Sequence, residues 1–234
     1  MPSFREFRET EELWQRFPAL ERAEAGSGRM LLTFDDGPDD DSTPAVLEAL
    51  DRIGARATFF MLGEQLMRHQ AIGREVVARG HEVALHGFGH EKHERLTPQQ
   101  VRDDLARGLG AVEAATGRRP RFYRPPYGRF SEASYDACRT LELEPVYWSA
   151  WGIDWEPIPA ERIAELVGRD LADGVIVLLH DSPRYAERPS AAPTAQALAM
   201  LAERALEAGL AFGALGDAVS ALRPSARSAR ASRR

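Results

Sequence analysis

Two adjacent carboxylates stand where an apolar run gives way to a turn. The run LLTF at 31–34 is typical of a buried strand, and the Gly-Pro pair at 37–38 marks its end. Asp35 and Asp36 lie between them, and their charges repel unless a metal ion, a catalytic proton or a nearby cation offsets them. A solvated turn is the alternative, because Asp-Gly and Gly-Pro are ordinary turn formers.

A histidine pair offers metal-binding chemistry. The segment HGFGH places His86 and His90 four residues apart, so that on a helical turn both imidazoles would face one ion. Asp36 could complete a facial set of two histidines and one carboxylate, which leaves positions open for water and substrate. The two intervening glycines favour a tight loop over a regular helix. Ordinary surface histidines are the alternative, since four of the six histidines fall within 81–93.

Two further side chains could move a proton or balance a charge. His180 follows the apolar run IVLL, and a histidine at a strand end is suited to act as a general acid, because its pKa lies near working pH. Arg124 precedes two prolines that stiffen the backbone, so that it could hold a carboxylate in its charged state. The alternatives are a packed core histidine and, in a chain with 29 arginines and one lysine, a surface arginine.

Strand-like runs alternate with helical stretches, which predicts parallel βα units. The runs are RMLLTF at 29–34, ATFFML at 57–62, HEVALH at 81–86, RFYR at 121–124, EPVYW at 144–148, GVIVLLH at 174–180 and LAFGAL at 210–215. Polar or ionisable groups end or follow five of them: Asp35 and Asp36, His86, Arg124, Trp151 and Asp154, and His180 and Asp181. Because the carboxyl ends of parallel strands meet at one edge, these groups are expected on one rim.

Capping residues predict where the helices begin. Helices are expected from Thr43-Pro44 to Gly54, over 64–80, from Thr97-Pro98 to Gly117, and from starts at Ser131, Pro159 and Thr194.

The chain of 234 residues is long enough for one sizeable core. We expect one domain over 29–222, a helical extension at 1–28, and a disordered arginine-rich tail at 223–234.

Charge and composition exclude several classes of protein. The tail carries five arginines and no acid, so the rest of the chain has a formal charge of −11 against −6 overall, which argues against a nucleic-acid partner. No stretch of 18 apolar residues predicts a membrane span, and the charged N-terminus has no signal-peptide core. We therefore expect a soluble, cytoplasmic protein. The single cysteine, Cys138, allows no intramolecular disulfide and is expected to be packed.

In chain order, TFDDGP, HGFGH, RPPYG, DW and LLHD resemble the five motifs of the polysaccharide deacetylase family, also called the NodB-homology family or carbohydrate esterase family 4. The resemblance covers roughly residues 29–220. It implies an α/β fold, a distorted (β/α) barrel with about seven parallel strands. It also implies a divalent metal ion, zinc first, with cobalt, nickel or iron compatible with the same donors, and an acetylated glycan as substrate.

The resemblance also implies a role for each motif residue. Asp35 would be the general base that deprotonates a metal-held water, Arg124 would hold Asp35, and the Tyr127 N–H would stabilise the oxyanion. The implied metal ligands are Asp36, His86 and His90. His180 would be the general acid, tuned by Asp154. The implied substrate pocket comprises Trp155 and Leu178, which would line the acetyl-methyl site, together with Pro126 and Trp151.

Three features depart from the family pattern. Gly87 stands where the family usually has Ser or Thr, and Trp151 where it often has another acid. Trp151 and Trp148 are expected either to stack on a sugar ring or to pack in the core. The 182–194 loop is long for the family, and we expect Arg184 and Tyr185 to reach toward the substrate.

The resemblance implies a metal-dependent hydrolase that removes N-acetyl groups from chitin- or peptidoglycan-type glycans. A hydrolase of another amide or ester is the second reading, with acetylxylan or a cyclic imide or ureide as substrate. The third is a catalytically dead glycan-binding protein, against which the complete set of motif residues counts.

Overall fold

The computed structural model describes residues 12–24 and 26–219. The expected tail at 223–234 and the first eleven residues of the expected extension lie outside this range. No helix in the described part of the chain is long and apolar enough to cross a membrane.

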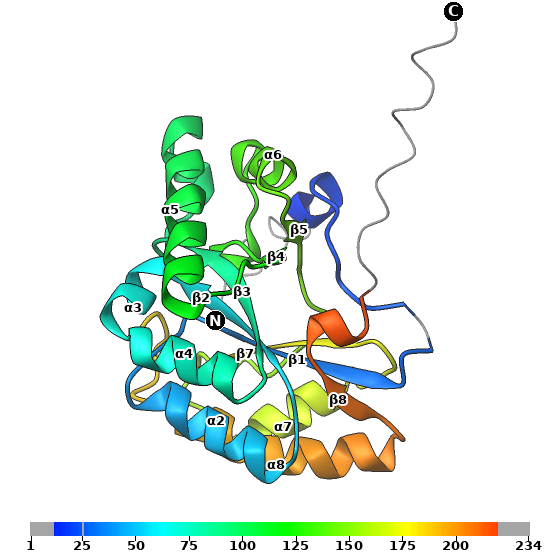
Figure 1. The fold of residues 1–234 in the computed structure, drawn as a ribbon. Helices are drawn as coiled ribbons and strands as arrows, with labels where there is room; N and C mark the ends of the chain where they lie inside the picture. The colour runs from blue at the N-terminus through cyan, green and yellow to red at the C-terminus, as the bar shows by residue number, and fades with distance from the viewer. Residues whose placement is uncertain (1–11, 25, 220–234) are drawn as a thin grey trace, which may run out of the picture.

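Within the described residues, eight strands form one curled, all-parallel sheet around β1 (Figure 1). Seven strands lie in the order β5-β4-β3-β2-β1-β7-β6, and β8 pairs with the start of β1. The strands are β1 (Arg29–Asp35), β2 (Thr58–Leu62), β3 (Glu82–Gly87), β4 (Phe122–Tyr123), β5 (Glu144–Pro145), β6 (Ala150–Trp151), β7 (Ile176–His180) and β8 (Ala211–Gly213). The predicted distorted barrel of about seven parallel strands is confirmed.

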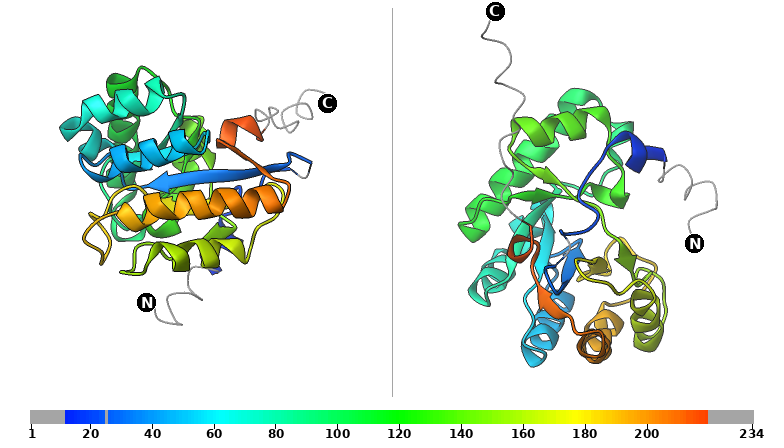
Figure 2. Two further views of the ribbon diagram at one scale, coloured as in Figure 1. Left: turned by 90° about the horizontal axis from the view of Figure 1, so that it is seen from below. Right: turned by 90° about the vertical axis from the view of Figure 1, so that its right-hand side faces the viewer.

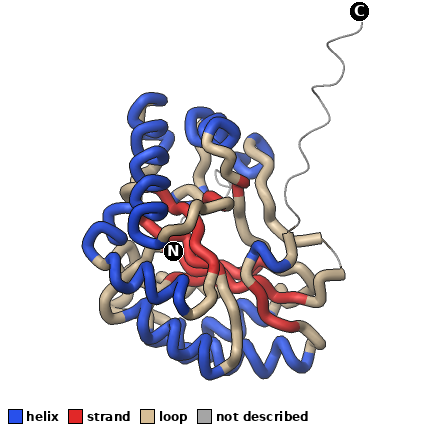
Figure 3. Tube along the Cα trace, in the orientation of Figure 1, coloured by secondary structure: helices blue, strands red, loops and turns tan. Residues whose placement is uncertain are grey.

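Helices cover the outside of the sheet, as the views in Figures 2 and 3 show. They are α2 (Ser42–Arg52), α3 (Gly63–Arg68), α4 (Gln70–Ala78), α5 (Pro98–Thr116), α6 (Glu132–Thr140), α7 (Ala160–Gly168) and α8 (Ala192–Glu207), with single 3₁₀ turns at His93–Arg95, Pro126–Gly128 and Leu215–Asp217. α8 packs between α2 and α7, and α5 packs against α3, α4 and α6. β1 is buried throughout after Arg29, as expected for a strand covered on both faces.

The N-terminal segment bonds to the end of β5 and to the residues that precede β7. Residues 12–16 are helical, and the chain then runs beside the gap between β5 and β6. The Leu20 N–H donates to the Pro145 carbonyl at 2.9 Å, and the Tyr147 N–H donates to the Leu20 carbonyl at 2.8 Å. Further along, the Ala23 N–H donates to the Gly174 carbonyl at 2.8 Å. The segment therefore supplies backbone hydrogen bonds to a rim that the short strands leave unpaired.

Three predicted helix starts are confirmed. Thr97 caps α5 with a reciprocal bond to Gln100, Ser131 caps α6 in the same way, and Pro159 immediately precedes α7. Two other starts lie earlier than predicted, because Thr43 and Thr194 use their hydroxyls for other partners.

The single helix predicted over 64–80 is wrong. The chain breaks at His69 into α3 and α4, and α4 then approaches α3 so closely that a Cβ on Gly73 would lie 2.5 Å from Leu66. Glycine at 73 allows this contact, but no proline or glycine marks the break itself.

The strand predicted over 144–148 is also wrong in extent. β5 ends at Pro145, and the chain crosses to form β6 beside β7, a strand that the pattern did not predict. Trp151 therefore lies in a strand and not in the following loop.

Candidate active site

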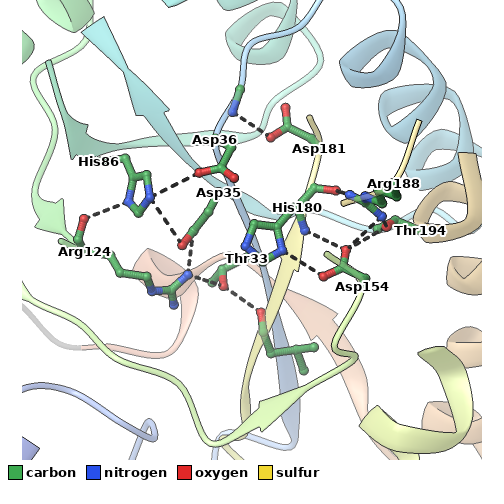
Figure 4. Close-up of polar contacts among 12 residues, drawn as sticks. Thr33, Asp35, Asp36, His86, Arg124, Asp154, His180, Asp181, Arg188 and Thr194 are labelled. Atoms are coloured by element: carbon green, nitrogen blue, oxygen red, sulfur yellow. Dashed lines mark hydrogen bonds and ion pairs between the residues drawn. The ribbon is translucent and has the colours of Figure 1, made fainter. Parts of the chain in front are cut away.

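The two adjacent aspartates point in different directions. Asp35 is the last residue of β1 and faces Arg124, whereas Asp36 has a left-handed backbone (φ 81°) and faces His86 (Figure 4). The next residue, Gly37, donates its N–H to Asp181 at 3.1 Å, and a Cβ there would lie 2.2 Å from the Asp181 carboxylate. The glycine therefore permits the close approach of the Asp181 carboxylate to this turn.

Asp35 accepts a hydrogen bond from a buried arginine. Arg124 Nη1 donates to Asp35 Oδ1 at 2.7 Å and to Thr33 Oγ1 at 2.9 Å, and Nη2 donates to the Tyr147 carbonyl at 2.8 Å. The guanidinium also lies 4.2 Å from the Phe60 ring centroid. Burial lowers the pKa of Arg124 and the Asp35 charge opposes that shift. An arginine nevertheless stays charged, so Asp35 has a fixed counter-charge beneath the rim.

Asp36, His86 and His90 form a group that could hold a metal ion, with one ligand atom of each within 4.8 Å of the others. Asp36 Oδ1 lies 3.4 Å from His86 Nε2 and 3.2 Å from His90 Nε2. His86 Nδ1 donates to the Arg124 carbonyl at 2.8 Å, because a carbonyl can only accept, and this leaves the Nε2 lone pair directed at Asp36. Burial would raise the pKa of Asp36, but the neighbouring His90 outweighs it and holds that pKa well below its usual value.

A second charged pair lies on β7 and the loop after β6. His180 Nδ1 donates to Asp154 Oδ1 at 2.8 Å, so Nε2 is the nitrogen left for other chemistry. Asp154 Oδ2 accepts from the His180 N–H at 2.9 Å and from Thr194 Oγ1 at 2.7 Å, and it lies 3.4 Å from Arg188 Nη1. Burial lowers the pKa of His180, but the Asp154 charge and hydrogen bond prevail and raise it to about 9.

Both groups open onto one cleft of about 710 Å³. Its lining includes Asp35, Asp36, His86, His90 and His180, together with Tyr127, Trp148, Trp151, Trp155, Leu178 and Tyr185. Five segments far apart in sequence thus meet at the carboxyl edge of the sheet. This geometry can hold a cation beside a carboxylate and place a protonated imidazole across from it.

The sequence matches the polysaccharide deacetylase family over residues 22–146. The chain belongs to this family. A chitooligosaccharide deacetylase of Bradyrhizobium sp. (strain ANU 289) is 35% identical over 158 residues, which cover 67% of this chain and 72% of that protein. A peptidoglycan-N-acetylglucosamine deacetylase of Listeria monocytogenes is 32% identical over 71% of this chain, and the chain spans only 35% of that relative.

The fold agrees with that of solved family members. The structure of a family 4 acetyl xylan esterase from Clostridium thermocellum, in complex with a cobalt ion, has a TM-score of 0.72 and 32% identity. The match covers 79% of this chain and 87% of that one.

Two expected pocket residues differ in placement. Trp151 is half-buried and lines the cleft. Trp148 also lines the cleft, although its side chain is only 8% exposed, so it packs in the core and borders the site. Pro126, in contrast, is buried and is not among the lining residues, whereas its neighbour Tyr127 is 47% exposed and has a left-handed backbone (φ 60°).

Of the two residues expected to reach the substrate from the loop after β7, Tyr185 lines the cleft and Arg184 does not. The Tyr185 ring stacks on His90 with centroids 4.2 Å apart, and its hydroxyl donates to Glu64. Arg184 is exposed and does not line the cleft. The loop also brings Arg188 beneath His180, where its Nη2 donates to the His180 carbonyl at 2.9 Å.

Asp104 is a supporting residue that the motifs did not indicate. From α5 it accepts the N–H groups of Phe88 and Gly89, each at 3.0 Å, and so fixes the loop between the two histidines. Gly87 has a left-handed backbone (φ 110°), and a Cβ there would lie 3.0 Å from Asp104 Oδ2. Gly87 thus replaces the usual Ser or Thr at a position where the Asp104 carboxylate of α5 holds the same loop. Neither Asp104 nor Arg188 has a local pattern that could have revealed it.

Proposed function

We propose that this protein is a divalent-metal-dependent hydrolase that removes N-acetyl groups from amino-sugar oligo- or polysaccharides. The observation that carries the proposal is the single cleft onto which Asp35, the Asp36-His86-His90 group and His180 all open. Amide hydrolysis needs a base for the attacking water and an acid for the leaving nitrogen, and this cleft offers both. The relatives named chitooligosaccharide and peptidoglycan-N-acetylglucosamine deacetylase support the choice of an acetylated amino sugar.

The donor set fits a divalent ion. Asp36 Oδ1 is buried and has no hydrogen-bond partner among the described residues, and His86 presents an unprotonated Nε2 beside it. Asp36, His86 and His90 would hold the ion; we propose zinc, and the same ligands suit cobalt, nickel or iron. When bound, the ion would lower the pKa of a water molecule and polarise a carbonyl oxygen.

The chain's own residues would do the remaining work. Asp35, held by Arg124, would accept a proton from the attacking water, and the proposed oxyanion donor is the Tyr127 N–H. His180 would protonate the leaving nitrogen through Nε2, because Nδ1 is bonded to Asp154. Trp155 and Leu178, which line the cleft, are proposed as the wall around the acetyl methyl group.

Acetate release from N-acetylglucosamine oligomers tests the proposal. Chelated protein should be inactive, added zinc or cobalt should restore release, and Asp35→Asn should lower release by about 10²-fold or more with metal present. Absence of release from folded, metal-loaded protein would overturn the proposed substrate.

Ester hydrolysis is the second candidate, favoured by the similarity to the Clostridium thermocellum acetyl xylan esterase. Acetate release from acetylxylan but not from amino-sugar oligomers would favour ester hydrolysis. Cyclic imides and ureides are the other substrates to test. Glycan bound unchanged under every condition would instead indicate a catalytically dead binding protein.

A further inference from the structure

We propose that Trp14 contacts the substrate and extends the cleft along an aromatic wall, so that the protein favours glycan chains over single sugars. The nature of the substrate rests on the proposed function. The wall itself rests on ring contacts and on the lining of the cleft.

Four tryptophans form a continuous series that starts at the acid histidine. Trp155 meets His180 edge-on at 5.7 Å between ring centroids, and Trp151 lies 5.8 Å from Trp155. Trp148 follows at 6.0 Å from Trp151, and Trp14 at 4.9 Å from Trp148. All four tryptophans line the cleft. The wall therefore runs from the proposed reaction centre to a residue of the N-terminal segment.

Trp14 is held firmly in this place. Its ring stacks on Tyr147 at 4.2 Å and 10° between planes, and its Nε1 donates to the Gly128 carbonyl at 3.1 Å. Nearby, Phe17 is buried against Phe130 and Tyr135, which anchors the same segment to the barrel. The Trp14 ring is thus partly exposed and already ordered in the cleft. A glycan that binds against it would cost the Trp14 side chain no further conformational entropy.

The chemistry of the cleft suits a chain of sugar rings. Aromatic surfaces bury the C–H face of a ring, while polar groups at the edge can bond its hydroxyls. Polar side chains lining the cleft include Glu21, Lys92 and Arg129, and the Lys92 ammonium lies 4.8 Å from the Tyr127 ring centroid. An acetylated sugar beside His180 would place its neighbours in the chain along Trp151 and toward Trp14.

The test compares Trp14→Ala and Trp14→Phe with Arg16→Ala. Arg16 is exposed on the same helical turn, pairs with Glu132 and does not line the cleft, so its replacement controls for docking of the segment. Two readouts are used: kcat and KM for N-acetylglucosamine oligomers from monomer to hexamer, and the Kd of the hexamer by calorimetry in an Asp35→Asn background.

Trp14→Ala should raise KM and Kd for the longer oligomers by about tenfold, or about 1.4 kcal/mol, and leave kcat and the monomer unchanged. Trp14→Phe, which retains a ring, should stay close to wild type, as should Arg16→Ala.

An equal loss of kcat at every chain length would overturn the inference, because it would assign Trp14 to support of the Gly128 turn. Unchanged KM and Kd in Trp14→Ala would also overturn it, and so would a wild-type protein that binds no oligomer. If the wild type binds the hexamer in a Trp14-dependent way but releases no acetate, the proposed function fails and the aromatic wall stands.

Discussion

Asp35 on β1 and His180 on β7 are register partners in adjacent parallel strands. Both residues therefore leave the sheet at the same level of its carboxyl edge, and each has its own buried counter-charge. Asp35 is paired with Arg124, and His180 with Asp154 (Figure 4). Two neighbouring strands thus present a carboxylate and an imidazole in separate electrostatic settings, as acid–base chemistry at one bond requires.

Replacement of Asp35 should lower stability as well as activity. Arg124 is fully buried, and Asp35→Ala would leave its charge without a carboxylate partner. The free energy of unfolding of the metal-free protein should fall by about 3 kcal/mol. Asp35→Asn should cost less stability, because the amide oxygen can still accept from Arg124, yet activity should fall by about 10²-fold or more in both variants. Urea denaturation followed by circular dichroism measures the first effect and acetate release the second. Equal stability of wild type and Asp35→Ala would contradict the assigned pair.

The acid form of His180 should set an alkaline limit on activity. Its pKa is raised to about 9, so the imidazolium is present below that pH and is lost as pH rises through it. Asp154→Asn removes the charge that raises this pKa, and the alkaline limb of kcat/KM should move to lower pH by about one unit or more. The ion pair's contribution to stability should likewise be complete below about pH 6.5 and disappear as pH rises toward 9. If the alkaline limb did not move in Asp154→Asn, the group that sets it would not be His180.

Most of the site residues that the sequence predicts lie at the ends of strands. In LLTFDDGP, EVALHGFGH and IVLLHD, polar residues directly follow an apolar strand, so one short segment indicates both the strand and the groups it presents. Asp104, Arg188 and Trp14 gave no such signal, since each acts on residues distant in the chain. Arg188 sits 34 positions beyond Asp154 in sequence yet lies 3.4 Å from its carboxylate. Thr194 predicts a helix start, but its hydroxyl donates to Asp154 and the helix begins two residues earlier.

Arg188 should act as a positioning residue for His180, the proposed general acid. It is buried, bonds the His180 carbonyl and Thr194, and shares the Asp154 carboxylate with the imidazole. Arg188→Met removes a positive charge that lowers the pKa of Asp154 and competes for its carboxylate, so His180 should be held protonated more strongly. The alkaline limb should shift upward and kcat should fall by about tenfold, with KM little changed. Arg184→Met on the same loop, where the side chain is exposed, is the matched control and should behave as wild type. If kcat fell but the alkaline limb did not move, Arg188 would contribute only to packing of the loop.

Asp104 should govern how tightly the histidine loop binds a metal. Its carboxylate accepts two backbone N–H groups between His86 and His90, so Asp104→Ala frees the segment that sets the spacing of these two proposed ligands. Supporting residues of this kind typically contribute 10- to 100-fold in metal affinity, and we expect a loss of about that size for zinc. Competition with a fluorescent chelator measures the affinity directly, without recourse to activity, and circular dichroism checks the fold. Asp103→Ala is the matched control, because that carboxylate is exposed on the outer face of α5 and bonds Gln99. Equal zinc affinity in the two variants would show that the left-handed Gly87 and its neighbours hold the loop without help from α5.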